Sequence, residues 1–299
     1  MVSKDRTAYI FLILATLFWS GNFIVGKAAS SFDIPPFTLN FYRWLFAWLI
    51  LAPFTLKEIY KTRSHILDNL KYVLILGITS ITLFNSIVYY SLQFTQVISG
   101  VLMISTIPVM IIFFSSLLKI EKTNLYQVAG VIFSMLGVVV IVTQLNEEKI
   151  KELSFNKGDL SIIIAMLYWA LYSALLKKNK LKLSQLSLLQ VIISAGLIFL
   201  LPIYIIEMNQ GRIVTLELPF ILTLIYVVLF PGLASFICWI KGIGLIGANR
   251  SGIFLHLMPI FSTVLAILIF KEKFMNFHLL GAVFIIGGIF LSSKKTKNG

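Results

Sequence analysis

Residues 100–131 read GVLMISTIPVMIIFFSSLLKIEKTNLYQVAGV, and they decide the fold because a related stretch follows later in the chain. That second stretch, residues 251–282, reads SGIFLHLMPIFSTVLAILIFKEKFMNFHLLGA. At an offset of 151 residues, the aligned pairs are Pro108 with Pro259, Glu121 with Glu272, Gly130 with Gly281, and Gly137 with Gly288. Trp19 and Trp169 align at an offset of 150 residues. Apolar composition alone does not produce this common spacing, so the sequence predicts two related halves.

The whole chain is too apolar for a water-soluble protein. Its 299 residues are 59% hydrophobic and only 12% charged, with a mean hydropathy of +0.95. A soluble domain carries roughly 25% charged residues. The apolar residues come in long blocks with few interruptions, as helices that cross a bilayer require. We therefore predict an all-α integral membrane protein whose main partner is the lipid bilayer.

Ten apolar blocks are long enough to cross roughly 30 Å of hydrocarbon as α-helices. They are residues 8–26, 36–56, 72–92, 98–118, 125–143, 160–176, 186–206, 219–240, 251–270 and 277–293. Because each half holds five spans, an odd number, the second half must enter the membrane upside down relative to the first. Such inverted repeats are common in transporters, where two similar halves exchange conformations around a midplane site. We predict a first repeat at 1–143, a connecting loop at 144–158, and a second repeat with a short basic tail at 159–299.

The net charge of +13 comes from Lys and Arg residues that lie mostly between the apolar blocks. With the N-terminus inside the cell, 17 of the 25 Lys and Arg residues fall in inside segments and 7 in outside segments. Arg43, the remaining one, lies within the second span. The bias predicts cytoplasmic termini, and it makes the charge a feature of topology and not of nucleic-acid binding. The richness in Lys, Ile and Asn is typical of an AT-rich bacterial genome, so we expect the inner (plasma) membrane of a bacterium.

Neither cofactor nor metal chemistry has support in the sequence. Cys238 is the single cysteine, and no CxxC or His/Cys metal spacing occurs. No GxxxxGK[ST] run is present, and no loop is long enough for an ATP-binding domain. The spans also lack the paired acids or the nucleophile with its base that a membrane-embedded enzyme would need. We therefore predict no cofactor, no metal ion and no catalytic residue.

Short motifs mark both halves. They are Phe18-Trp19-Ser20-Gly21-Asn22-Phe23, Phe41-Tyr42-Arg43-Trp44, Gly158-Asp159-Leu160 and Tyr168-Trp169-Ala170, with the proline, glutamate and glycine pairs above. This pattern resembles the EamA-type ten-helix exporters of the drug/metabolite transporter superfamily, and it extends over nearly the whole chain. The resemblance implies two inverted five-helix repeats and efflux of small metabolites, amino acids among them. His256 departs from the family pattern, which has a small or apolar residue before the ninth-span proline.

Arg43 is the one permanent charge inside the predicted spans, and it lies roughly 10 Å below the outer end of its span at 1.5 Å per residue. Polar groups are costly in hydrocarbon and usually face the bundle interior or a cavity. Arg43 is therefore a candidate to attract a substrate carboxylate or to tune a gate. The alternative is a structural arginine that bonds helix-end carbonyls or extends toward the outer surface.

Trp19 and Trp169 fall near the centres of their spans, although membrane tryptophans usually prefer the interfaces. Their repeat-equivalent positions predict opposite walls of a central cavity, where a ring stacks on a substrate or attracts an ammonium group. Packing within the bundle is the alternative. The other predicted cavity residues are Arg43, Asn22, Asn85, Tyr89, Tyr172 and His256. Asn22, Asn85 and Tyr89 either bind the substrate or bond between helices at roughly 0.6 kcal/mol each.

Pro108 and Pro259 lie near the midpoints of equivalent spans. Proline removes a backbone donor and kinks a helix, and matching interruptions in two halves point to a transporter binding site. We predict a hinge at each proline, with a static bend as the alternative. The glycines Gly130, Gly137, Gly281, Gly287 and Gly288 predict close helix contacts, within the chain or at a homodimer face. Glu121 and Glu272 are expected to cap helices or to pair with neighbouring charges.

Proton coupling usually needs a titratable group in the membrane. The predicted spans hold no Asp or Glu. His256 is the residue within them that has a pKa near neutrality, while His278 sits near a span end. Transport is therefore either facilitated diffusion, which the missing acid favours, or coupled to protons through His256. We predict a secondary transporter that exports small metabolites such as amino acids. The alternatives are an importer or exchanger of a nucleoside-containing metabolite and, more distantly, a membrane-embedded enzyme.

Overall fold

The computed structural model describes residues 4–294, apart from residues 23–24, 27–28, 30–31, 95–96, 148–156, 213, 215–216 and 271–273. Phe23 and Glu272 lie outside the described residues, as does most of the predicted connecting loop. The same is true of seven lysines used to predict the topology, namely Lys27, Lys149, Lys151, Lys271, Lys273, Lys295 and Lys297.

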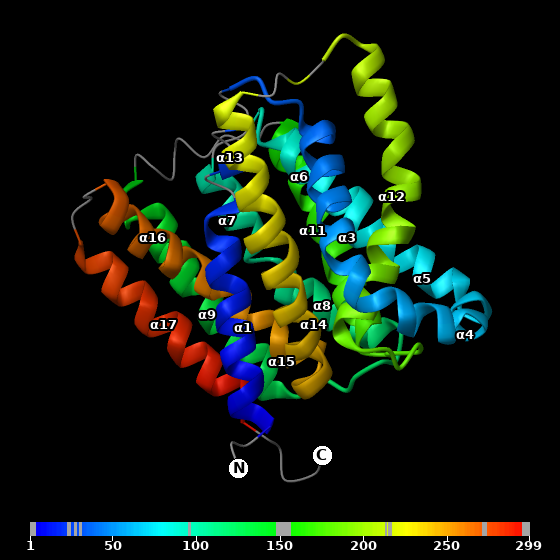
Figure 1. Ribbon diagram of the computed structural model, residues 1–299. Helices are drawn as coiled ribbons and strands as arrows, with labels where there is room; N and C mark the ends of the chain where they lie inside the picture. The colour runs from blue at the N-terminus through cyan, green and yellow to red at the C-terminus, as the bar shows by residue number, and fades with distance from the viewer. Residues whose placement is uncertain are drawn as a thin grey trace.

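In the described part of the chain every regular element is a helix (Figure 1). The first half holds α1 (Lys4–Ser20), α3 (Pro36–Lys61), α4 (Arg63–Asp68), α5 (Leu70–Gly77), the π-helix η1 (Ile78–Phe84), α6 (Asn85–Ser91), α7 (Val97–Ile104), α8 (Ile107–Leu117) and α9 (Leu125–Thr143). The second half holds α11 (Lys157–Leu176), α12 (Gln185–Asn209), α13 (Leu218–Val227), the π-helix η2 (Val228–Ala234), α14 (Ser235–Ile246), α15 (Ala248–Gly252), the 3₁₀-helix η3 (Ile253–His256), α16 (Leu257–Phe270) and α17 (Asn276–Ser292). The predicted span 125–143 coincides with α9, whereas α3 runs on from the predicted end at residue 56 to Lys61.

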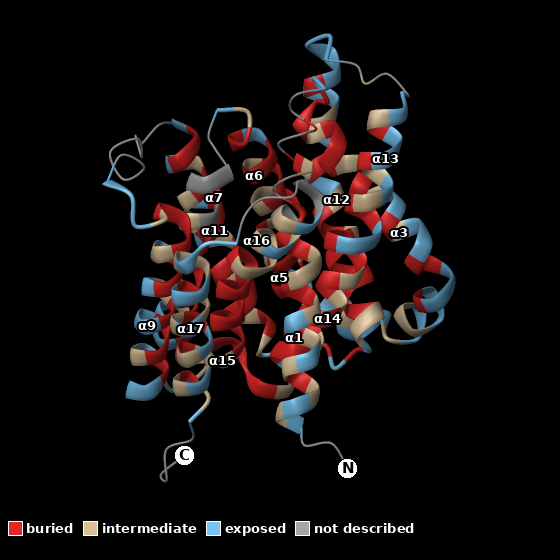
Figure 2. Ribbon diagram, turned by 90° about the vertical axis from the view of Figure 1, so that its left-hand side faces the viewer, coloured by how far each residue is buried: buried red, intermediate tan, exposed pale blue. Residues whose placement is uncertain are grey.

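Within the described residues, six helices are long and apolar enough to cross a membrane. They are Pro36–Lys61, Leu70–Ser91, Leu125–Thr143, Lys157–Leu176, Gln185–Asn209 and Leu218–Ile246. Large apolar side chains also cover the outer surface, with Phe54 at 74% and Phe290 at 72% exposed. Figure 2 shows buried residues on the inner faces of the helices and exposed ones on the outer faces. Such a surface suits a lipid solvent, and the fold fits an integral membrane protein.

Helix packing recurs in matched pairs in the two halves. Helix α1 packs against α14 and α16, and α11, which carries the repeat partner of Trp19, packs against α6 and α8. Helix α3 packs against α12, and α9 packs against α17. The π-helices also match, because η1 begins at Ile78 and η2 begins at Val228, at the same offset of 150 residues as the tryptophans. The two halves are therefore alike in local structure as well as in helix partners.

Polar side chains satisfy the backbone near η1. A π-helix inserts one residue into an α-helix and leaves nearby carbonyl groups without their usual donors. In η1 the hydroxyl of Thr79 donates to the carbonyl of Ile75 at 2.6 Å, and the hydroxyl of Ser80 donates to that of Leu76 at 2.6 Å. In η2 the sequence includes Pro231, which has no backbone N–H to give. Hydroxyl groups and a proline thus accommodate the same wide turn in the two halves.

Glycines bring α9 and α17 into direct backbone contact, as expected from the sequence. A Cβ atom on Gly130 would lie 2.6 Å from the carbonyl oxygen of Gly288, and one on Gly137 would lie 2.5 Å from that of Gly281. Gly287 faces the ring of Phe133. Gly130, Gly137, Gly281 and Gly288 therefore pack within the chain, the first of the two expected roles, whereas Gly287 is half-buried.

The helix interruptions of the two halves precede their prolines. Helix α7 ends at Ile104, a turn follows, and Pro108 lies in the first turn of α8, where a missing N–H costs no helix hydrogen bond. In the second half the 3₁₀-helix η3 ends at His256, and Pro259 lies in the first turn of α16. Each proline therefore starts a helix and does not kink a continuous one.

Two acids, the buried Glu207 and the half-buried Glu121, cap helix ends. Glu207 of α12 accepts hydrogen bonds from the backbone N–H of Thr38 at 2.6 Å and from its hydroxyl at 2.8 Å, at the start of α3. Glu121 accepts one from the backbone N–H of Asn249 at 2.8 Å, at the start of α15, which confirms a capping role. Both carboxylates face the positive end of a helix dipole.

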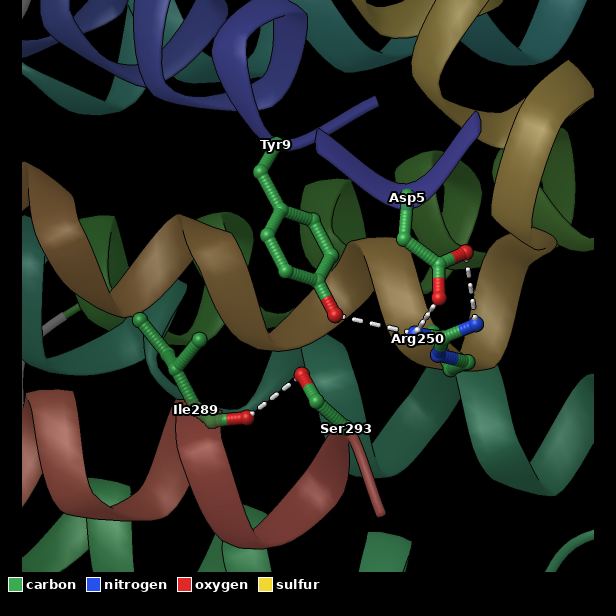
Figure 3. A network of polar contacts seen from close by, with 5 residues as sticks. All are labelled: Asp5, Tyr9, Arg250, Ile289 and Ser293. Atoms are coloured by element: carbon green, nitrogen blue, oxygen red, sulfur yellow. Dashed lines mark hydrogen bonds and ion pairs between the residues drawn. The ribbon is translucent and has the colours of Figure 1, made fainter. Parts of the chain in front are cut away.

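The beginning of α1 and the end of α17 lie at the same end of the bundle (Figure 1). There Arg250 pairs with Asp5 at 3.3 Å and donates to the hydroxyl of Tyr9 at 2.9 Å (Figure 3). This network ties the start of α1 to α15, so the first and second halves are joined at this surface.

Candidate functional site

A narrow cavity lies between the two halves. It is lined by Trp19, Asn22, Phe84, Asn85, Val88, Ile104, Ile107, Trp169, Leu255 and Met258. Nine of these ten side chains are buried, and Phe84 is half-buried. About 30 Å³ of the cavity is open to the centre of a water molecule, which is room for two or three waters at roughly 10–15 Å³ each. The cavity is therefore too small for an amino acid in this conformation.

Residues at equivalent positions of the two repeats meet around the cavity. Trp19 and Trp169 both line it, as do Ile104 with Leu255 and Ile107 with Met258, which are 151 residues apart. The ring of His256 contacts the carbonyl oxygen of Ser105 at 2.9 Å, and these two residues are also 151 positions apart. The cavity thus lies where the helix interruptions of the two halves come together.

The two tryptophan rings touch at the cavity instead of facing each other across open space. Their centroids are 5.1 Å apart and their planes meet at 89°, an edge-to-face contact. Phe236 packs against both rings, at 5.9 Å from Trp19 and 5.3 Å from Trp169. The indole N–H of Trp19 donates to the carbonyl of Pro231 at 3.0 Å. A ligand would have to separate the two indole rings. Once separated, the rings would present aromatic faces on which the ligand can stack.

Arg43 lies one side-chain layer behind the cavity wall and is fully buried. Its Nη1 donates to Asn85 Oδ1 at 2.9 Å and to the hydroxyl oxygen of Tyr89 at 2.7 Å. The Tyr89 hydroxyl in turn donates to Asn22 Oδ1 at 3.0 Å. Two cavity-lining amides are therefore linked to one buried cation.

The second Nη of Arg43 reaches the other half of the chain. It donates to the carbonyl oxygen of Pro231 at 2.9 Å, the same oxygen that accepts from Trp19. The guanidinium carbon lies 4.8 Å from the ring centroid of Trp44. Among the described residues no carboxylate forms an ion pair with Arg43, and its Nε has no acceptor. The site therefore contains a positive charge that the described protein groups do not neutralise.

Tyr172 and His256 lie next to the cavity residues without lining the cavity. The Tyr172 ring packs on Trp169 at 5.1 Å, and its buried hydroxyl has no partner among the residues that are described. His256 Nδ1 is 2.8 Å from the Ser134 hydroxyl. Because Nε2 faces a carbonyl oxygen, it must carry a proton, and a neutral ring can then accept from Ser134 at Nδ1. The neutral imidazole is thus fully satisfied.

The predicted residues divide into two layers. Trp19, Asn22, Asn85 and Trp169 line the cavity, whereas Arg43 and Tyr89 are hydrogen-bonded directly behind it. Six lining residues were not predicted, namely Phe84, Val88, Ile104, Ile107, Leu255 and Met258. They are ordinary apolar residues. The sequence could have indicated four of them, Ile104, Ile107, Leu255 and Met258, only because they lie near the aligned prolines at the repeat offset of 151 residues.

The chemistry of this site suits binding and not catalysis. Aromatic rings, two amides and a buried guanidinium can hold an apolar group together with an anionic group. In the described part of the chain no three His, Cys, Asp or Glu side chains gather as metal ligands.

The sequence profile of the EamA-like transporter family matches residues 6–143 and again residues 156–294. The chain is similar to the "uncharacterized transporter YyaM" of Bacillus subtilis, with 24% identity over 97% of this chain and 94% of that protein. It is also 25% identical to an "uncharacterized transporter" of Archaeoglobus fulgidus, over 97% of this chain and 99% of the relative. One of Clostridium kluyveri is 27% identical, over 98% of this chain and 94% of the relative.

A solved crystal structure aligns over 97% of both chains, with a TM-score of 0.73 and 16% identity, which is a likeness of fold. The relatives are named as transporters, in agreement with the expectation that the chain is not an enzyme. With apolar helices long enough to span a bilayer, and with a family profile that covers both of its halves, the chain belongs to the EamA-like transporter family and is a multi-pass membrane transporter.

Proposed function

We propose that the protein is a secondary transporter that exports small metabolites such as amino acids by alternating access. The observation that carries this proposal is the meeting of repeat-equivalent residues, the two tryptophans above all, around one cavity between the halves. Two similar halves can exchange conformations and so expose a shared site to either side in turn. The narrow cavity then belongs to a conformation without room for the substrate, and Pro108 and Pro259 are the hinges at which the helices move to widen it.

The proposed topology is ten spans in two inverted five-helix repeats, with a first repeat at 1–143 and a second at 159–299. The matched π-helices and helix partners support two like halves. An inverted second half follows from the odd number of spans in each. The excess of Lys and Arg on one side supports cytoplasmic termini in a bacterial inner membrane. A homodimer, if it forms, uses a surface other than the α9–α17 glycines.

Two other functions have weaker support. An importer or exchanger of a nucleoside-containing metabolite would use the same cavity, because a carrier runs down whichever gradient exists. A membrane-embedded enzyme would need a nucleophile or acid pair, and none lines the cavity among the described side chains.

Counterflow in proteoliposomes tests the proposal. Vesicles are preloaded with unlabelled amino acids, nucleotides or other metabolites, and uptake of a trace of the labelled compound is followed. Exchange with one class of metabolite is the expected result. If no compound exchanges across a broad panel while the protein elutes as a folded species, a transport role for this cavity is wrong.

The energy source separates two versions of the proposal. Facilitated diffusion is favoured, because His256 is fully hydrogen-bonded as a neutral ring and because Glu207, a buried acid near the end of α12, is engaged in capping α3. In proton-coupled transport, His256→Ala would abolish the response to an imposed pH gradient while counterflow continued.

A further inference from the structure

Arg43 is an unusual residue for a membrane interior because its charge is permanent and fully buried. Burying an ion without a counter-ion costs several kcal/mol even after the protein relaxes. Its acceptors, Asn85, Tyr89 and Pro231, are neutral groups, and one donor, Nε, has no acceptor in the described structure. The site is therefore electrostatically incomplete without an anion.

The position of Arg43 links that missing anion to the cavity. Asn85 lines the cavity and holds Arg43 Nη1 at 2.9 Å through its side-chain oxygen. An oxyanion that enters the cavity can take the place of Asn85 Oδ1, because a charged acceptor forms a stronger hydrogen bond than an amide. The repeat partner of Asn85 is Ser235, which bonds instead to the carbonyl of Ala15 at 3.1 Å. The buried cation therefore contacts the cavity wall of the first half, and the equivalent position in the second half has no such contact from Ser235.

The same guanidinium also joins the two halves. Arg43 of the first half and Trp19 of the first half both donate to the carbonyl of Pro231 in the second half. Turning Arg43 toward an oxyanion in the cavity would withdraw Nη2 from Pro231. The contact would then rest on the single bond from Trp19, whose ring a substrate must also displace.

We propose that Arg43 receives an oxyanion of the substrate, a carboxylate in an amino acid, and that the oxyanion replaces Asn85 and Pro231 as acceptors and so releases a contact between the halves. This inference rests on the proposed transport function and narrows its substrates to anionic or zwitterionic metabolites. Uncharged and purely cationic analogues fail to release the contact.

The test compares compounds that carry a carboxylate or phosphate with analogues that lack it, in counterflow and in ligand-induced thermal stabilisation of the purified protein. The pairs are phenylalanine with phenylalaninamide, alanine with alaninamide, and AMP with adenosine. We compare wild type, Arg43→Gln, Arg43→Lys and the control Arg212→Gln, which loses an exposed arginine outside the site. Wild type should prefer the member with the oxyanion in at least one pair by roughly ten- to hundredfold, the range for losing a hydrogen bond to a charged group.

Arg43→Gln should reduce that preference to within about threefold, Arg43→Lys should keep most of it, and Arg212→Gln should match wild type. The amino-acid pairs and the nucleotide pair distinguish a carboxylate from a phosphate. Equal use of acid and amide by wild type, or a preference that persists in Arg43→Gln, overturns the proposal even if transport itself is intact. If counterflow fails for every compound, the thermal shifts still decide, because only anion recognition predicts stabilisation by the acid and none by its amide. If Arg43→Gln does not fold, the preferences of wild type and Arg43→Lys are compared instead. The proposal predicts that both prefer the compound with the oxyanion, and equal use of the two members of each pair overturns it.

Discussion

A methyl group placed on Gly130 should separate α9 from α17. In Gly130→Ala the new Cβ lies 2.6 Å from both the carbonyl oxygen of Gly288 and the backbone nitrogen of Ser292. Ordinary contact begins near 3.4 Å, so the helices must move apart by about 0.8 Å. Neither atom can turn away, because both belong to the helix backbone. Overpacking of this kind costs typically 1–3 kcal/mol.

Replacing a helical glycine by alanine also stabilises the helix, and a control variant must measure this gain separately. Replacing glycine by alanine inside a helix gains roughly 0.5–1 kcal/mol from propensity alone. Gly244 of α14 has no heavy atom within 4 Å of its would-be Cβ, so Gly244→Ala shows this gain by itself. Gly287→Ala meets only the ring of Phe133, at 3.1 Å, and should fall between the two. The difference between Gly130→Ala and Gly244→Ala should therefore be about 1–3 kcal/mol.

The assay heats each purified variant in detergent and measures the folded fraction by size-exclusion chromatography. At roughly 2–4 °C per kcal/mol, Gly130→Ala should lose its folded peak several degrees below Gly244→Ala, with Gly287→Ala between them. Equal midpoints for all three variants would refute the reasoning, since they would mean that α9 and α17 do not touch through these glycines.

Glu207→Gln should lower the free energy of unfolding by about 1 kcal/mol, because it weakens the cap on α3. The control Glu217→Gln should change it little, because Glu217 is exposed and makes no side-chain cap bond. Thermal midpoints in detergent measure both, and equal losses would contradict the capping role. A pH gradient imposed across proteoliposomes should change the initial uptake rate by less than about twofold in wild type, because both ring nitrogens of neutral His256 are hydrogen-bonded. A strong acceleration that disappears in His256→Ala would favour proton coupling through His256. Green fluorescent protein fused to either terminus should fluoresce in bacterial cells, since the charge bias predicts that both termini lie in the cytoplasm. A dark fusion at one end only, with the protein present in the membrane, would contradict an even number of spans.

Much of the architecture could be predicted because hydrophobic length and repeat spacing are properties of the sequence itself. The helix α9 coincides with its predicted span, and the aligned tryptophans do meet at one cavity. The π-helices could not be predicted, because a widened turn leaves no periodic mark in a run of apolar residues. Thr79, Ser80 and Pro231 are the residues that accommodate it, and each type also occurs in ordinary membrane helices.

The candidate site could likewise be predicted only in part. Polar and aromatic residues such as Asn22 and Trp169 are conspicuous in an apolar span, and the sequence identified them. Apolar lining residues such as Val88 and Ile104 are not conspicuous, because nothing local distinguishes a cavity wall from a lipid-facing surface. The connection from Arg43 to the carbonyl of Pro231 was also out of reach, since it joins positions 188 residues apart through a backbone atom.

The paired wide turns set the direction of the side chains that follow them in both halves. Segments Ile78–Phe84 (ITSITLF) and Val228–Ala234 (VLFPGLA) share a single identical position, Leu83 with Leu233, yet both form a π-helix. An extra residue in a helix turns every later side chain by about 100°, so a wide turn in one half alone would rotate the residues after it relative to their counterparts. With a wide turn in both, Asn85 and Ser235 follow at equivalent positions. The two halves thus share backbone geometry here although they share almost no side chains.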